Sequence, residues 1–466
     1  PPGPADDASG QCLSWARIVD TYAFELDEWK RFDDCISVFR ELRKEYPVFP
    51  STETDLAASS RMLISLILRR TDEPREIARW SGHVFDLLKE DPSPDIQMDT
   101  LFYISIYYLW KGDYHKNAVL LEEVDAKVLY HNQPPLTVIR ARMMRGVHDW
   151  VTARYEPALR AFSEGLTIAG ESGVHVFDSL LWSFCAAAEM AAGNMGRAGM
   201  CLKNQKTAAF ATGNSLDIFF YHINAAWKAI LMGNPSLAAE NLERITARVD
   251  RIGNPYFQAL WNIGMAQARF MEGNVHNAKA HIREAHRLGL DMKSQVIEWY
   301  SLLVEAYFLF EEGSKGKGLP LLRRALALGS RHGYAHLEFY HPRVMGLICM
   351  KALEHGIEPA YVRGLIKDLG LTPPAGVADS APAEENWPYR VKIYTLGRFE
   401  IFKDEKPMVF SGKVQRKPLE MLKAIIAFGG TNVAAGDLTD TLWPDADGDL
   451  AHKSLEVTLS RLRQLL

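Results

Sequence analysis

The residues of this sequence best suited to chemistry are basic and hydroxyl side chains close to Leu466. Arginine can donate two parallel hydrogen bonds to the edge of a guanine, and lysine, serine and threonine can neutralise or hydrogen-bond phosphate groups. The set comprises Lys453, Ser454, Thr458, Arg461 and Arg463. These types predict a surface that contacts double-stranded DNA. The alternative for Arg461 and Arg463 is that they are ordinary solvated charges on a helix.

A helix must position these side chains, and its pattern is visible in AHKSLEVTLSRLRQLL, residues 451–466. Four leucines follow the spacing i, i+4, i+7 and i+11, which forms one apolar stripe on a helix. They are Leu455, Leu459, Leu462 and Leu466. The five polar residues lie off this stripe, so we expect them on the solvent-facing side.

Short strands and two more helices are predicted ahead of this helix. Alternating apolar residues favour three antiparallel strands, at 391–396, 399–402 and 407–410, with a turn at 404–406. A helix is expected from Arg416, with Pro418 in its first turn, as far as Gly429-Gly430. A second helix is expected at 435–442, and the third begins near Leu450.

A second group of candidate residues lies around these two helices. Lys413, Arg416 and Lys417 form a basic cluster at a helix start, where either phosphate contact or plain solubility accounts for them. Trp443 can be a core aromatic.

These segments together resemble a known family of DNA-binding domains. LGRFEIFKDEKPMVF, RKPLEMLKAIIAF, LTDTLWPDA and SLEVTLSRLRQLL occur in the order found in OmpR/PhoB-type winged-helix domains, and the LWP and SRLR motifs are most similar to SARP-type activators. The resemblance covers 389–466 and implies transcriptional control through a recognition helix at 451–466. For Trp443 it implies, as the alternative to a core position, contact with DNA or with RNA polymerase. That family adds a β-hairpin wing after this helix. We therefore expect the chain as given to bind DNA weakly, and a continuation past Leu466 to restore binding.

Composition is compatible with this interpretation. The chain has 466 residues and a net charge of −5, yet residues 389–466 carry 12 Lys and Arg against 10 Asp and Glu. An acidic body with a mildly basic end permits DNA binding through that end alone. Five scattered cysteines argue against a disulfide framework and fit a cytoplasmic protein.

The longer part of the chain contains a repeat of 40 residues. Gly-Asn pairs recur at 193, 233 and 273, and Gly313-Ser314 follows them. Five residues after each glycine stands a small residue, in a column that extends backwards. The column comprises Ala78, Ala118, Ala158, Ala198, Ala238, Ala278 and Gly318, and a second column comprises Gly146, Ala186, Ala226, Ala266 and Ala306. Stacked helical hairpins explain both columns, because helices approach closely at small residues. One such hairpin is expected to pair helices 219–232 and 237–249.

This repeat resembles tetratricopeptide repeats in an elongated form, as in large signal-transduction regulators of the maltose-regulon-activator type. The resemblance covers roughly 15–369. It implies a mainly α fold: a tetratricopeptide-like α-solenoid of hairpins about 40 residues long at 1–370. A linker at 371–388 and a small α/β winged-helix domain at 389–466, truncated before its wing, complete the expected organisation. A nucleotide-binding module upstream of Pro1 is also implied.

The sequence therefore predicts a bacterial transcription regulator that is not an enzyme. Its expected partners are promoter DNA and RNA polymerase, with a small-molecule inducer or a protein partner on the repeats and no membrane. We expect no cofactor, because GSKGKG at 313–318 lacks the spacing of a phosphate-binding loop. The alternative is a non-enzymatic interaction scaffold whose small C-terminal domain does not bind DNA.

Overall fold

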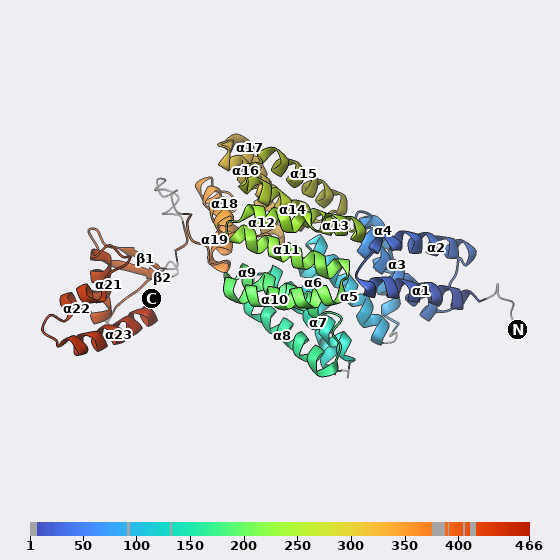
Figure 1. The fold of residues 1–466 in the computed structure, drawn as a ribbon, viewed down its shortest axis with the longest axis horizontal. Helices are drawn as coiled ribbons and strands as arrows, with labels where there is room; N and C mark the ends of the chain where they lie inside the picture. Colours follow the sequence, from blue (N-terminus) through green and yellow to red (C-terminus); the bar gives the residue numbers. More distant parts are fainter. Residues whose placement is uncertain are drawn as a thin grey trace. The chain divides into compact units, whose positions relative to one another are not determined.

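The fold comes from a computed structural model that describes residues 7–90, 94–130, 133–374, 387–389, 391–403, 406–410 and 416–466. The chain divides into two compact units, Pro1–Asn386 and Trp387–Leu466. Most of the predicted linker lies outside the described residues. Figure 1 shows the helical array in blue to orange and the small unit in red.

The first unit is built from antiparallel helical hairpins, as the repeat predicts. Its helices in the first three hairpins are α1 (Ala8–Glu25), the 3-10 helix η1 (Trp29–Arg31), α2 (Phe32–Glu45), α3 (Thr52–Arg69), α4 (Pro74–Leu88), α5 (Pro94–Lys111) and α6 (Tyr114–Tyr130). The next three contain α7 (Pro135–Val151), α8 (Tyr155–Ser172), α9 (Asp178–Ala191), α10 (Met195–Thr212), α11 (Ser215–Leu231), α12 (Pro235–Glu243) and α13 (Thr246–Ile252). The last are α14 (Pro255–Met271), α15 (Val275–Met292), α16 (Gln295–Glu311), α17 (Lys315–His332), α18 (Pro342–Glu354) and α19 (Pro359–Asp368).

The Gly-Asn pairs form the turn inside each hairpin. Gly233 and Gly273 have φ of +72° and +81°, the left-handed region in which glycine ends helices. Asn234 and Asn274 then cap the following helix, because each side chain accepts a hydrogen bond from a first-turn backbone amide. Ala153 occupies the equivalent position one repeat before Gly193 and also has a positive φ, +60°. The predicted hairpin fold is confirmed.

The small-residue columns lie where the helices meet. All five members of the second column, from Gly146 to Ala306, are buried. The first column is buried from Ala158 to Gly318 but does not extend as far back as predicted. Ala118 is half-buried and its neighbour Asn117 is fully buried, because Gly112 forms the turn one residue early and shifts the register. Ala78 is exposed, so its predicted place in the first column is wrong.

One hairpin differs from its prediction in the second helix. The expected continuous helix at 237–249 is divided into α12 and α13. The indole Nε1 of Trp261 donates a hydrogen bond of 2.9 Å to the carbonyl of Leu242, close to the break. A side chain that takes a helix carbonyl in this way interrupts the regular ladder.

The array forms a superhelix, in which each of the first three hairpins contacts the fifth hairpin after it along the chain. The backbone amide of Leu216 donates to the carbonyl of Leu26 at 2.9 Å. One hairpin later, Asn254 Nδ2 donates to the carbonyl of Leu68 at 2.7 Å, and after another, Ser294 Oγ donates to that of Trp110 at 2.5 Å. Asn254 and Ser294 also cap α14 and α16, so one column of capping residues joins successive turns of the superhelix.

An irregular segment, Tyr334–Tyr340, fills the interior of this coil. All seven residues are buried although none lies in a helix or strand. Its end is held by Trp227 Nε1, which donates to the carbonyl of Tyr340 at 2.8 Å, and its start by the Tyr334 hydroxyl, which donates to the carbonyl of Gly112 at 2.8 Å. The segment therefore connects α17 to α18 through the middle of the array.

The second unit contains a three-stranded antiparallel sheet in the order β1-β2-β3 and three helices. Its elements are β1 (Val391–Tyr394), β2 (Glu400–Lys403), β3 (Lys406–Pro407), α21 (Arg416–Ala427), α22 (Ala435–Leu442) and α23 (Gly448–Leu465). Ile393 pairs with Ile401 across β1 and β2. The third strand is shorter than predicted. The backbone amide of Met408 still donates a hydrogen bond to the carbonyl of Ile401, but residues 408–410 are irregular. A core around Ile401, Met421 and Leu455 joins the sheet to the helices.

Candidate functional site

The helix α23 packs one face into the core of the small unit. Its buried residues are Ala451, Leu455, Thr458 and Leu462. Thr458 is only 7% exposed, so its predicted position off the apolar stripe is wrong, while its contact with DNA stays a prediction. Thr458 lies about a turn from Leu455 and Leu462, closer to the centre of the buried face than Leu459, which is half-buried.

The basic residues of α23 lie on its other faces. Lys453, Arg461 and Arg463 are exposed, and Ser454 is half-buried. Among the described residues, no ion pair involves any of the three cations. Arg461 and Arg463 are two positions apart and therefore about 200° apart around the helix, so they flank the exposed face on opposite sides. Lys453 lies about 80° around the helix from each of them, midway across the exposed face.

The second predicted cluster is engaged within the unit itself. Arg416 Nε lies 2.9 Å from Glu420 Oε1, and Lys417 Nζ lies 3.1 Å from Glu420 Oε2. Lys417 Nζ also donates to the carbonyl of Leu442 at 2.9 Å, at the end of α22, and lies 5.6 Å from the half-buried ring of Trp443. Their contact with DNA stays a prediction. Lys413 lies outside the described residues.

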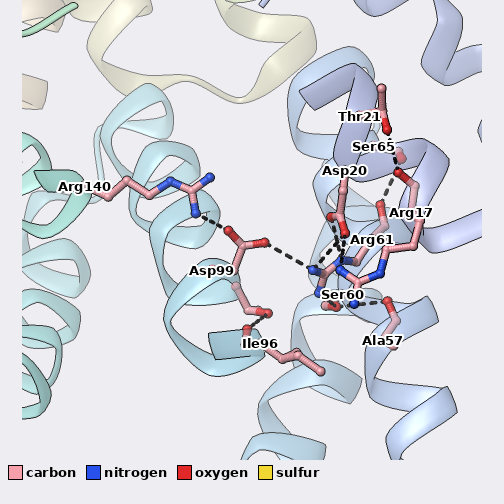
Figure 2. Close-up of polar contacts among 11 residues, drawn as sticks. Arg17, Asp20, Thr21, Ala57, Ser60, Arg61, Ser65, Ile96, Asp99 and Arg140 are labelled. Atoms are coloured by element: carbon pink, nitrogen blue, oxygen red, sulfur yellow. Dashed lines mark hydrogen bonds and ion pairs between the residues drawn. The ribbon is translucent and has the colours of Figure 1, made fainter. Parts of the chain in front are cut away.

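The array contains a polar cleft that sequence reasoning missed. Its volume is about 520 Å³, and it lies among α1, α3, α5 and α7. Four charged residues from these helices alternate in sign across it, as Figure 2 shows. Arg61 Nε lies 2.8 Å from Asp20 Oδ1, and Arg61 Nη2 lies 3.4 Å from Asp99 Oδ2. Asp99 then contacts Arg140 Nη1. Each charge thus has an opposite partner, which repays much of the cost of its burial.

The four alternating charges Asp20, Arg61, Asp99 and Arg140 form a polar ladder. Arg140 is its most enclosed end. Its guanidinium carbon lies 4.6 Å and 4.8 Å from the ring centres of Phe24 and Phe102. Its Nε and Nη2 are buried and have no hydrogen-bond partner among the described residues. The aromatic faces therefore provide most of its remaining stabilisation.

A second, aromatic cavity adjoins the cleft. Its volume is about 100 Å³, and Phe24, Phe102 and Met144 line both spaces. Its other walls include Trp110, Trp150 and Tyr256. Glu338, from the irregular segment, is the single charged residue among the described residues that line it. Burial raises the pKa of this carboxyl to about 7.

The two spaces together suit the binding of an amphipathic molecule, with polar groups in the cleft and an apolar body in the cavity. Part of this was signalled in the sequence: Arg61 precedes the apolar run MLISLIL, and Glu338 stands in HLEFY among aromatic residues. Their neighbours were not: the partners of Arg61 lie on adjacent hairpins, 38 and 41 positions away, and the residues around Glu338 come from helices much further away in the chain.

Metal-binding groups and membrane-spanning helices are the other features that could indicate a function. Within the described ranges, no group of three or more His, Cys, Asp or Glu residues is placed to hold a metal ion. None of the described helices is long and apolar enough to cross a membrane.

Comparison with known proteins supports the helical-repeat fold. No family model matches the chain, and no curated protein matches it significantly. A solved Rap protein complexed with competence and sporulation factor aligns with a TM-score of 0.55 and 11% identity, over 78% of this chain and 98% of that chain. NprR in complex with its cognate peptide NprX aligns at 0.43 and 14%, over 68% and 89%. The Cut9–Hcn1 hetero-tetramer of APC/C aligns at 0.41 and 15%, over 78% and 67%. At these identities the likeness concerns the fold alone: the array is a tetratricopeptide-like solenoid.

Proposed function

We propose that this protein is a bacterial transcription regulator that binds promoter DNA through α23 and senses a ligand or partner through its repeat array. The observation that best supports DNA binding is the exposed trio Lys453, Arg461 and Arg463, without an ion pair among the described residues. An unpaired surface cation gives up no existing partner when it meets a phosphate, and the release of counterions then favours binding.

The packing of the small unit supports a rigid presentation of this helix. The core around Met421 and Leu455 ties α23 to α21 and to the sheet, so the side chains on its outer faces are fixed in direction. Arg461 is the residue proposed to read a base edge, and Lys453 is proposed to contact a phosphate. Trp443, half-buried beside Lys417, is proposed to approach the DNA backbone or RNA polymerase.

The array is proposed to take the ligand, without catalysing a reaction on it. The cleft and the aromatic cavity provide the space for this ligand. Their charged residues are proposed to bind and not to catalyse, because within the described part of the chain Arg61, Asp99 and Arg140 pair with one another or with Asp20. The solved Rap structure, which has an array of similar fold, contains its competence and sporulation factor. This supports, by analogy, a ligand-binding role for the array here.

The test is a fluorescence-anisotropy titration of a labelled random-sequence duplex with the 466-residue chain at several salt concentrations. We expect a Kd that weakens steeply with salt, in the range of about 10⁻⁴ to 10⁻⁶ M for non-specific binding. Replacing Lys453 with alanine should reduce the slope of log Kd against log salt by about 1. On a selected operator, Arg461→Ala should cost about 1–3 kcal/mol of sequence discrimination.

The matched control is Arg160→Ala, which removes an exposed cation from α8 in the array. It should leave both affinity and slope unchanged. Binding that does not depend on salt, or that Arg160→Ala weakens as much as Lys453→Ala, contradicts the proposal and favours the interaction scaffold.

A further inference from the structure

The aromatic cavity contains a buried carboxylate oxygen with no hydrogen-bond partner. Glu338 is 6% exposed, and its Oε2 has no donor among the described residues. Within the described part of the chain no basic side chain forms an ion pair with Glu338, and the ionisable groups near it are the phenols of Tyr114, Tyr256 and Tyr300. An unpaired carboxylate in an apolar cavity is costly, and a cation beside it would lower that cost.

The backbone around Glu338 is strained in a way that fixes its position. Phe339 has φ of +66°, a conformation that bulky residues adopt at a cost of about 1–3 kcal/mol. Its ring fits against Gly264, where a Cβ would lie only 2.4 Å from Cζ of Phe339. Together with the bond from Trp227 to Tyr340, this contact directs Glu338 into the cavity. Ala153 and Lys293 have positive φ at helix ends, whereas Phe339 lies in the buried irregular segment, next to the carboxylate.

Aromatic rings surround the space that the carboxylate faces. Trp110 and Tyr256 are stacked with ring centres 5.2 Å apart, and Trp29, Tyr114 and Trp150 complete the wall. Indole and phenol faces attract cations, most strongly when water is excluded. The cavity therefore combines the two features that recognise organic ammonium groups, a counter-charge and an aromatic enclosure.

We propose that this cavity binds an organic ammonium ion carried on an apolar body, with Glu338 as its counter-ion. The inference rests on the proposed role of the array as the ligand-binding part of the protein. The volume of about 100 Å³ admits an ammonium head with a short apolar body, and the shared wall with the polar cleft gives the rest of a larger ligand room to extend. Phe24, which is 36% exposed, lies at this junction.

The experiment is isothermal titration calorimetry of the full chain with 2-phenylethylammonium and with 2-phenylethanol, a neutral probe of the same shape. At pH 8 the ammonium should bind at least tenfold more tightly than the alcohol. Glu338→Gln should remove this preference and leave the affinity for the alcohol unchanged. Glu189→Gln, a buried glutamate of α9 that pairs with Asn194 and Arg197 away from the cavity, should keep it.

A measurement on the unaltered protein covers the case in which Glu338→Gln does not fold. The ammonium requires the ionised carboxylate, and burial holds the pKa of Glu338 at about 7. Its affinity should therefore rise about tenfold from pH 6 to pH 8, whereas that of the alcohol should not change. His336 stays neutral over this interval because burial lowers its pKa to about 4, and burial keeps the nearby phenols neutral.

Equal affinity for the two probes, no rise with pH, an unchanged preference in Glu338→Gln, or no binding of the ammonium would each overturn the proposal. These titrations contain no DNA, so they are independent of whether α23 binds promoter DNA.

Discussion

Asp99 is the most consequential residue of the polar ladder for stability. It lies between two guanidinium groups, and the side chains of Arg61 and Arg140 are only 8% and 9% exposed. Asp99→Asn keeps the shape of the side chain but removes its charge. Arg61 retains Asp20, whereas Arg140 loses its only ion pair among the described residues. Because breaking a buried pair leaves an uncompensated charge, we expect a loss of about 3–5 kcal/mol in the free energy of unfolding.

The assay is urea denaturation followed by far-ultraviolet circular dichroism, with an exposed pair as the matched control. Glu41 and Lys44 are 68% and 73% exposed, so Glu41→Gln should change stability by less than about 0.5 kcal/mol. Adding Arg140→Met to Asp99→Asn removes the stranded charge and should recover most of the loss. A single-variant loss below about 1 kcal/mol, or a double variant that loses the sum of both single changes, would refute the reasoning.

Three further changes test the repeat. Ala226→Leu inserts a large side chain at a fully buried helix contact and should lower the free energy of unfolding by about 1–3 kcal/mol. The control Met232→Leu, at a position 67% exposed, should leave it unchanged. A thermal melt that neither substitution changes contradicts the small-residue column. Lys293 has φ of +53°, and glycine occupies the equivalent position 40 residues earlier and later. Lys293→Gly should therefore raise the free energy of unfolding by about 0.5–1 kcal/mol in a denaturant titration. A lower free energy of unfolding would refute this. Burial lowers the pKa of His148 to about 4, so its contribution, up to about 3 kcal/mol, is present above pH 6.5 and is lost as pH falls toward 4. His148→Asn should reduce the loss of stability over that interval without abolishing it, because burial also lowers the pKa of His336 to about 4; an unchanged profile argues against the buried neutral form.

Much of the hairpin architecture could be predicted because it is local. The turn glycine and the small residue five positions later belong to the same hairpin, so their spacing in the sequence is enough to predict them. Gly233, with its positive φ, and the buried Ala238 are an example. The same reasoning failed where the register slips by one residue. Asn117 took the buried position predicted for Ala118, and the sequence offers no small residue there to reveal it.

The polar ladder and the aromatic cavity could not be predicted in the same way. The ladder joins residues 38 to 41 positions apart on adjacent hairpins, and nothing in one hairpin alone shows that these side chains pair. The aromatic cavity depends on the coiling of the array, which joins residues about 190 positions apart, such as Leu26 with Leu216. A single charged residue such as Glu338 shows no periodic pattern in the sequence. On α23, an apolar stripe drawn from leucines alone placed Thr458 on the wrong face, because a threonine can lie on a buried face when its neighbours one turn away do.

DNA is proposed to contact the exposed faces of α23, and the array offers a competing basic surface. A cleft of about 680 Å³ along α10–α13 is lined by Lys206, Lys228, Arg244 and Arg248. Hydrogen–deuterium exchange of the full chain, with and without a duplex at low salt, distinguishes the two surfaces. We predict that DNA slows exchange in Gly448–Leu465 and leaves α10–α13 unchanged. Protection confined to α10–α13, or none in α23, would contradict the account.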